Sequence, residues 1–299
     1  MAEPLPLCYL NGEYIALRDA RISPLDRGFL FGDSVYEVLP AFGGRMFLFR
    51  EHFDRLARSL REIRLPNPHT HEEWLGILEQ LIARNGGGDM YVYLQVTRGM
   101  EYGRNHAFPA VVQPCVFAMA SPLPVFSEEQ RNTGLSAITV QDFRWGRCDI
   151  KTTALLANVL MKQQAADAGA NEAIIVRDGE VLEGSSTSVF VVIGGVLVTP
   201  PNSHSILPGT TRDAALALAT AVMPAEIRKI SVEELRAADE VWISAATRDV
   251  LPVTRIDGAP VGNGRPGPAW LGMSHSFKNL RQQLAGTPVL GAVDSSRLT

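Results

Sequence analysis

Near the middle of the chain, residues 142–153 carry the stretch DFRWGRCDIKTT. A strand is predicted before it over 136–143. A helix is predicted after it over 153–168, with a threonine hydroxyl as its N-cap and Gly169 as its stop. The stretch therefore joins a strand to a helix and places Lys151 at the junction. A lysine at such a junction is a candidate catalytic residue, although position alone leaves a non-catalytic role open.

Lysine is scarce in this chain, whose 28 basic residues are 24 arginines and four lysines. Chemistry that needs a neutral amine therefore has four candidates. Lys162 lies on a predicted amphipathic helix, Lys229 adjoins an arginine in a polar turn, and Lys278 lies in a C-terminal helix, so each is typical of a solvated surface lysine. Lys151 is the favoured nucleophile, while an arginine-biased composition explains the scarcity without any function.

The composition predicts a soluble globular protein without a nucleic-acid partner, a membrane span or a metal site. Of 299 residues, 46% are hydrophobic and 20% charged, and the formal net charge of −4 is spread without a basic block. Three scattered cysteines (Cys8, Cys115 and Cys148) fit neither a disulfide framework nor a cysteine metal site, and they favour a reducing compartment. Neither a signal peptide nor an apolar run of about 18 residues is recognised, so a cytoplasmic location is expected.

Strands and helices follow one another without a regular strand–helix–strand alternation, which predicts two α+β domains rather than a doubly wound sheet. The two prolines of SPLPVFS, residues 121–127, make this segment the expected linker. A smaller domain is expected over 1–120, and a larger one carrying Lys151 over 128–299. Strands are expected over 7–10, 13–16, 34–41, 45–49, 90–97, 110–120, 136–143, 172–177, 180–182, 187–193, 196–199 and 241–244, helices over 49–63, 71–85, 153–168, 210–222 and 270–284, a loop over 19–31, and a frayed tail at the end.

Two further segments are candidates for ligand binding in the second half of the chain. Glu183 stands beside a glycine and three hydroxyl residues in EGSST, residues 183–187, where it could face a cationic group such as a pyridinium. A hydrogen-bonding turn explains the same residues. LPGTT, residues 207–211, opens a predicted helix whose N–H groups and dipole would bind an anion, although any capped helix has this pattern.

The first half of the chain contains a long loop that could bind a carboxylate. RGMEYGRNHAFP, residues 98–109, has no predicted structure of its own, and such loops are often functional. Arg104 and His106 could grip a carboxylate, or they could be solvated cations. Tyr36 could be a half-buried core residue, and Arg55 faces away from the apolar stripe of its helix, which by itself predicts a surface position.

Taken together, six stretches resemble the fold-type IV pyridoxal-phosphate enzymes, and among them the D-amino-acid (D-alanine) aminotransferases. The resemblance runs from about Tyr9 to Leu284 and implies a two-domain α+β fold with the cofactor at the domain interface. The matching stretches are SPLDRGFLFGDSVYEV (23–38), HFDRL (52–56), LQVTRGMEYGRNHAFP (94–109), FRWGRCDIKTTALLANVL (143–160), NEAIIVRDGEVLEGSSTSVF (171–190) and ILPGTTRD (206–213).

The resemblance implies a role for each matching residue. Lys151 would form the internal aldimine, a Schiff base with pyridoxal 5'-phosphate, and would shuttle the proton at the substrate α-carbon. Glu183 would pair with the pyridine nitrogen and keep it protonated. Arg55 would bind the phosphate together with Thr210, Thr211, Ala246 and Thr247, and Leu207 would pack against the ring. Tyr36, Arg104 and His106 would form the substrate carboxylate trap, with the 98–109 loop reaching the active site of a partner in a homodimer.

The resemblance also implies the activity, which is transamination of D-amino acids such as D-alanine with 2-oxoglutarate or pyruvate. The alternatives are a branched-chain L-amino-acid or (R)-amine aminotransferase, an aminodeoxychorismate lyase-like enzyme, and a protein that binds the cofactor without turnover. The Arg104–His106 pair favours the D-amino-acid type. This chain departs from the family pattern at Ser34, at Ser188 and at Ala245–Asp249, where Arg248 brings a large cation near the expected phosphate region.

Overall fold

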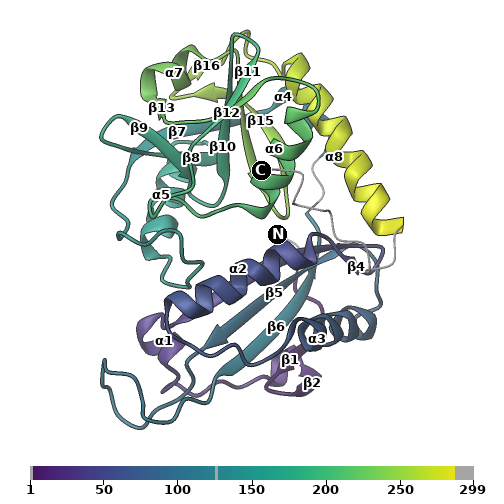
Figure 1. Ribbon diagram of the computed structural model, residues 1–299, viewed down its shortest axis with the longest axis vertical. Coiled ribbons are helices and arrows are strands. Elements are labelled where there is room, and N and C mark those ends of the chain that lie inside the picture. The colour runs from purple at the N-terminus through teal and green to yellow at the C-terminus, as the bar shows by residue number, and fades with distance from the viewer. Residues whose placement is uncertain (1–2, 125–126, 287–299) are drawn as a thin grey trace. The chain divides into compact units, whose positions relative to one another are not determined.

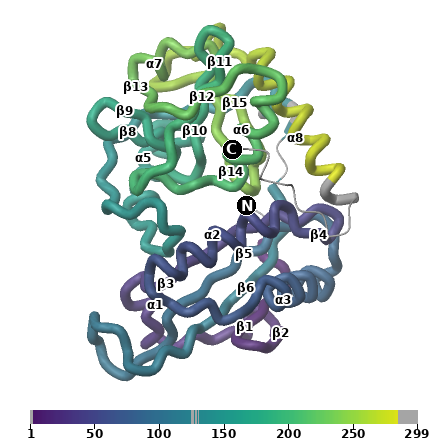
Figure 2. Tube along the Cα trace, viewed as in Figure 1, coloured from purple at the N-terminus to yellow at the C-terminus, as the bar shows by residue number. Residues whose placement is uncertain are grey.

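The computed structural model describes residues 3–124 and 127–286. By their contacts these residues form two compact units (Figures 1 and 2), unit 1 with residues 3–124, 150–154 and 284–286, and unit 2 with residues 127–149 and 155–283. Each unit contains a β-sheet and helices, so the expected α+β fold is confirmed. Among the described residues, no helix has both the length and the apolar character that crossing a membrane requires.

The domain limits proposed from sequence order stay a prediction. Segment 150–154 groups by contacts with unit 1, although sequence order assigned Lys151 to the C-terminal domain. Ser121 and Pro122 of the predicted linker are the last residues of a strand, and 125–126 lie outside the described residues. The predicted frayed tail also lies outside them, from residue 287 onward.

Unit 1 is built on a six-stranded antiparallel sheet in the order β2-β1-β6-β5-β3-β4. Its first hairpin turns at Asn11 and Gly12, both with positive φ, as a two-residue hairpin turn requires. The strands are β1 Leu7–Leu10, β2 Glu13–Ala16, β3 Ser34–Phe42, β4 Arg45–Met46, β5 Met90–Thr97 and β6 Cys115–Pro122.

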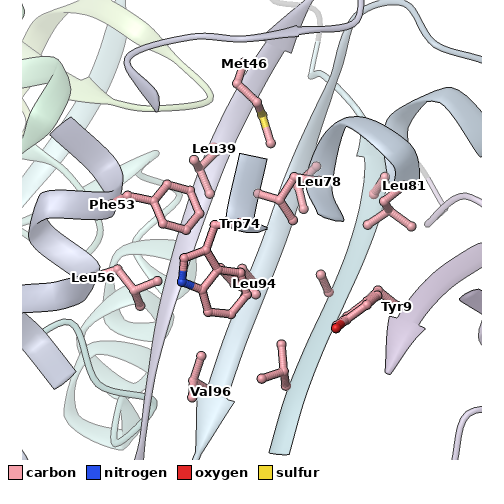
Figure 3. Packing of buried hydrophobic residues seen from close by; sticks show 14 of the residues in the cluster. Tyr9, Leu39, Met46, Phe53, Leu56, Trp74, Leu78, Leu81, Leu94 and Val96 are labelled. Carbon is pink, nitrogen blue, oxygen red and sulfur yellow. The ribbon is translucent and has the colours of Figure 1, made fainter. Parts of the chain in front are cut away.

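Two helices, α2 (Phe49–Glu62) and α3 (His71–Arg84), contact this sheet and enclose the core of unit 1. Figure 3 shows Trp74 at the centre of that core, with Phe53 and Leu56 of α2 beside it. Trp74 is fully buried, so its replacement by alanine would cost about 3–5 kcal/mol of stability. Thr70 and Glu73 form a capping box that begins α3 at the predicted residue.

The expectation of a loop over 19–31 was wrong for its last residues, because Arg27–Phe31 form the short helix α1. The Asp26 carboxylate caps this helix by accepting the Gly28 N–H at 2.7 Å, and it also accepts the Thr97 hydroxyl at 2.8 Å. A helix of five residues is too short for its apolar period to be visible in a sequence. Leu17–Asp19 form a short 3-10 helix before it.

Unit 2 is built on a mixed sheet in which β7 pairs in parallel with both β8 and β15. Its order is β12-β11-β10-β14-β15-β7-β8-β9-β13, with β16 paired to β15. Strand β15 was missed in the sequence because Pro252 argues against a central strand. The strands are β7 Leu135–Gln141, β8 Glu172–Arg177, β9 Glu180–Gly184, β10 Ser188–Ile193, β11 Val196–Thr199, β12 Ala225–Ile227, β13 Ile230–Ser231, β14 Glu240–Ala245, β15 Asp249–Ile256 and β16 Ala259–Pro260.

The helix after Lys151 begins three residues later than expected, at Leu156. The prediction that a threonine hydroxyl caps this helix was wrong, because the hydroxyls of Thr152 and Thr153 bond instead to Gly32 and Ser34. The helices that remain are α4 Glu128–Thr133, α5 Leu156–Asp167, α6 Thr210–Thr220, α7 Val232–Ala237 and α8 Pro268–Gly286.

Candidate active site

Lys151 lies beside β3 of unit 1 and is held there through its backbone. Its N–H donates to the Ser59 hydroxyl at 3.3 Å, and its carbonyl accepts from the Tyr36 N–H at 2.9 Å. A bridge between Val35 and Thr152 continues this pairing by one residue. The half-buried side chain brings Nζ to 4.2 Å from the centroid of the Tyr36 ring. Two of the predicted site residues, far apart in sequence, are therefore neighbours in space.

Tyr36 is not packed in the core of unit 1 but lies half-buried on β3. Its ring stacks on Tyr93 of the adjacent strand β5, with 5.6 Å between the ring centroids. The Tyr93 hydroxyl donates to Gln95 at 2.8 Å, and burial raises the pKa of Tyr93 to about 12. Tyr93 is therefore a neutral hydrogen-bonding group over the whole physiological range.

The helix pattern alone predicted a surface position for Arg55, on α2, and this prediction was wrong because Arg55 is buried. Its Nε and Nη2 donate to the two oxygens of Glu37 at 2.8 Å each, so the pair is bidentate. His52, one helical turn earlier, also bonds to Glu37. The sequence patterns assigned no role to Glu37 or His52. The signal that could have found them was an acid within an apolar strand, together with a helix rich in basic residues.

Arg104 and His106 lie on the exposed loop between β5 and β6, which extends away from the sheet in Figure 1. The His106 ring packs edge-on against Phe31, and the Arg104 guanidinium lies 5.2 Å from the centroid of the same ring. The buried Arg27 guanidinium donates to the carbonyls of Asn105, His106 and Ala107, which fixes the loop backbone. Arg104 and His106 thus both contact Phe31, whereas Tyr36, the third predicted residue of the carboxylate trap, lies beside Lys151.

In unit 2, Glu183 lies in β9, which extends one residue past it to Gly184. One carboxylate oxygen of Glu183 bonds to Arg144 Nη1, and the other accepts the Leu207 N–H at 3.1 Å. Burial opposes the charge of Arg144, but Asp142 and Glu183 overcome it and raise the pKa of Arg144. Glu183 is therefore a buried carboxylate with a fixed orientation. Arg144 stands in the stretch 142–153, but the sequence pattern did not single it out.

Leu207 lies three residues before Thr210, the first residue of α6, and both Thr210 and Thr211 are buried. The N-cap is Gly209, which has no side chain to occupy the first N–H groups of the helix. A Cβ atom there would lie 2.6 Å from the Ser188 Oγ, so an alanine would require the Ser188 hydroxyl or the turn to move. A helix N-terminus without a capping side chain suits a phosphate.

Ala246 and Thr247 are half-buried in the turn between β14 and β15. The neighbouring cation, Arg248, lies with Nη1 at 3.8 Å from the buried carboxylate of Glu172. Glu172 also accepts the hydroxyls of Ser185, Ser186 and Thr187, the residues that follow Glu183. The charge of Arg248 is thus balanced within unit 2. Glu172, like Arg144, is a residue that the sequence patterns did not single out.

These residues fit pyridoxal phosphate unit by unit. Unit 1 offers an amine beside an aromatic ring and a buried guanidinium, which suit an aldehyde and a phosphate. Unit 2 offers a fixed carboxylate and an anion-binding helix N-terminus, which suit a pyridinium and a phosphate.

The comparisons with known proteins agree with this chemistry. The family model described as amino-transferase class IV matches residues 34–256. A D-alanine aminotransferase from Staphylococcus haemolyticus is 38% identical over 271 residues, which are 90% of this chain and 95% of that protein. One from Bacillus licheniformis is 40% identical over 270 residues, again 90% and 95% of the two chains. A branched-chain amino acid aminotransferase structure from Escherichia coli superposes with a TM-score of 0.85 at 27% identity, covering 96% of this chain and 97% of that one.

The chain belongs to the class IV aminotransferases. It is accordingly a pyridoxal-phosphate-dependent transaminase, an enzyme whose substrates are amino acids and 2-oxo acids.

Proposed function

We propose that this enzyme transaminates D-amino acids, such as D-alanine, with 2-oxoglutarate or pyruvate. The observation that carries the proposal is the 38–40% identity, over 90% of the chain, to proteins named D-alanine aminotransferase. The loop pair Arg104 and His106 supports it, because a guanidinium beside an imidazole offers several N–H donors to a substrate carboxylate.

Lys151 attaches the cofactor through Nζ in this proposal and moves the proton at the substrate α-carbon. Pyridoxal phosphate supplies the electron sink when it is bound. The backbone bonds of Lys151 to Ser59 and Tyr36 hold the root of the side chain, so Nζ moves only about its own side-chain torsions. That freedom lets the same amine attach the cofactor and then move the proton at the substrate α-carbon.

Glu183 keeps the pyridine nitrogen protonated in this proposal. A carboxylate at about 4 Å from a pyridinium contributes roughly 4 kcal/mol at an effective dielectric of about 20. The bond to Leu207 N–H orients the carboxylate, and Leu207 itself packs against the ring. Arg55, with Thr210, Thr211, Ala246 and Thr247, holds the phosphate.

Tyr36, Arg104 and His106 bind the substrate carboxylate in this proposal. The protein is a homodimer, and the 98–109 loop of each subunit, with Arg104 and His106, reaches the active site of its partner. The exposed apolar side chains around the loop support an interface, because such a patch on a soluble protein marks a contact surface. They are Phe29, Met100, Tyr102, Phe108 and Val111, which are 46–86% exposed. A cytoplasmic location belongs to the same proposal and is supported by the free thiols of Cys8, Cys115 and Cys148.

A branched-chain L-amino-acid aminotransferase is the second candidate, and a specific observation favours it. The solved structures named branched-chain aminotransferases cover 93–96% of this chain at TM-scores of 0.85 and 0.86. Their 25–27% identity is lower than that of the D-alanine enzymes, which is why the D-amino-acid reading is preferred. An (R)-amine aminotransferase, an aminodeoxychorismate lyase-like enzyme and a non-catalytic binding protein are less favoured.

One assay separates these functions. Purified protein loaded with cofactor is incubated with D-alanine or L-leucine and 2-oxoglutarate, and keto-acid formation is followed. We expect turnover with D-alanine. Turnover with L-leucine alone would favour the branched-chain reading, and no turnover with either would favour the binding protein. In parallel, Lys151→Ala should abolish the visible absorbance of the attached cofactor; an unchanged spectrum would move the role to another lysine.

A further inference from the structure

Helix α2 presents a polar stripe on its buried face, which a helix over a hydrophobic core does not need. The stripe consists of His52, Arg55 and Ser59, spaced three and four residues apart and each no more than 8% exposed. Buried polar groups are costly unless they are bonded, so their partners indicate their purpose. Ser59 accepts the Lys151 N–H, while His52 and Arg55 converge on Glu37 of β3.

Glu37 is fully buried and has both oxygens occupied. Oε1 accepts Arg55 Nε at 2.8 Å, and Oε2 accepts Arg55 Nη2 and contacts His52 Nδ1, also at 2.8 Å each. Burial opposes ionisation of Glu37, but the Arg55 guanidinium and the His52 ring overcome it and hold the pKa of Glu37 well below its usual range. The carboxylate is therefore charged and cancels the charge of Arg55.

His52 completes the arrangement as a neutral donor. Burial, with smaller contributions from Arg55 and Lys151, lowers the pKa of His52 although Glu37 acts in the opposite direction. A neutral imidazole beside a carboxylate donates its Nδ1–H to it. Glu37 is thus held from two sides, and its two bonds to the Nε–Nη2 edge of Arg55 fix the plane of the guanidinium.

We propose that Glu37 and His52 are positioning residues, which act through Arg55 by fixing its guanidinium for the cofactor phosphate. This inference rests on the proposed role of Arg55. It implies that Arg55 serves the phosphate as a rigid, oriented donor rather than as a net positive charge. These two views predict opposite changes in phosphate affinity when the charge of Glu37 is removed. Without the Glu37 charge, a site governed by net charge would bind an anion more tightly, whereas a site governed by orientation would bind it more weakly.

The test measures the Kd of pyridoxal phosphate for the apoenzyme by titration of the cofactor absorbance. We expect Glu37→Gln to raise Kd at least tenfold, Glu37→Asp to raise it less, and His52→Ala to raise it several-fold. His52→Asn, which keeps an N–H donor near the position of Nδ1, should restore most of the affinity. Glu62→Gln, at an exposed position of the same helix, is the matched control and should leave Kd unchanged. Equal or tighter binding by Glu37→Gln and Glu37→Asp would overturn the inference.

A double-mutant cycle distinguishes positioning from a general loss of structure. If Glu37 acts through Arg55, Glu37→Gln added to Arg55→Gln should raise Kd no further, while additive effects would mean an independent structural role and overturn the inference. Thermal unfolding of each apoenzyme identifies variants that fail to fold, and for these Glu37→Asp replaces Glu37→Gln. Normal affinity of Arg55→Gln itself would overturn the proposed phosphate role of Arg55, a result distinct from failure of Glu37 to support it.

Discussion

At the scale of single residues, the candidate site depends on charges that are paired before any ligand arrives. Glu183 is bonded to Arg144 and to the Leu207 N–H, and Arg55 is bonded to Glu37. Such pre-orientation is what a catalytic group requires, because it removes the cost of ordering the group during the reaction. Residue type alone could not reveal it, since Glu37 and Arg144 become partners of these residues only in the folded chain.

Glu183→Gln tests the electron-sink role at this scale. The amide keeps the shape of the side chain but loses the charge that stabilises a protonated pyridine nitrogen. We expect the variant to retain bound cofactor and to lose roughly 100-fold or more in kcat, a size typical of the loss of one preorganised electrostatic contact. Absorbance of the bound cofactor and steady-state kinetics with D-alanine are the two measurements. Near-normal turnover in a variant that binds the cofactor would reject the role.

At the scale of elements, long periodic segments were predicted well and short or irregular ones were not. Helices α2 and α3 begin at the predicted residues, because their apolar spacing is sustained over three or more turns. Helix α1 was not predicted, and the start of α5 was predicted three residues too early. The reason is that the side chains of Asp26, Thr152 and Thr153 bond to residues far away in the sequence. Tertiary hydrogen bonds, invisible to local patterns, decided those ends.

The N-terminus of α6 supplies a prediction at this scale. Gly209→Ala would place a Cβ 2.6 Å from the Ser188 Oγ and 3.1 Å from the Arg212 Cβ, so either the Ser188 hydroxyl or the first turn must shift. We expect a loss of about 1–3 kcal/mol in stability and a weaker affinity for pyridoxal phosphate, measured by urea unfolding and cofactor titration. Ser188→Ala removes the nearer atom and should restore part of both losses. A fully stable Gly209→Ala variant with normal cofactor affinity would contradict this account of the glycine.

At the scale of the whole molecule, the loop over 98–109 is the feature that a single chain leaves unexplained. Its backbone is fixed by Arg27, yet it presents Arg104 and His106 to the outside. A rigid exposed loop with chemistry-bearing side chains suits a second subunit.

Subunit complementation tests the shared site directly. Lys151→Ala and Arg104→Gln homodimers should each be inactive or weak. In a mixed dimer, one site combines the intact Lys151 of one subunit with the intact Arg104 of the other. Random mixing should therefore restore about one quarter of wild-type activity, since half of the dimers are mixed and each has one intact site of two. The two variants are refolded together so that their subunits mix, and activity per milligram is measured. No recovery of activity in verified mixed dimers would argue against a shared site.

The stability of the apoenzyme should also depend on pH in a predictable direction. The folded pKa of His52 lies below its ordinary 6.5, and that of Glu37 lies below its ordinary 4.5, so the unfolded chain binds these protons first as the pH falls. The free energy of unfolding should therefore decrease below about pH 6.5, with His52 contributing up to about 1.4 kcal/mol per pH unit. Urea unfolding of wild type and His52→Asn between pH 7.5 and 5 measures this, and an identical slope in both would exclude the His52 contribution.

The sequence by itself determined the class of fold, the long helices and hairpins, and a short set of candidate residues led by Lys151 and Glu183. Local patterns suffice there, because period, turn residues and a scarce lysine are properties of neighbouring positions. Only the tertiary structure decided that Arg55 is buried, that Tyr36 lies under the Lys151 amine, and that Arg248 is balanced by Glu172. These are contacts between distant segments, and burial and pairing of charges depend on what the fold brings beside them.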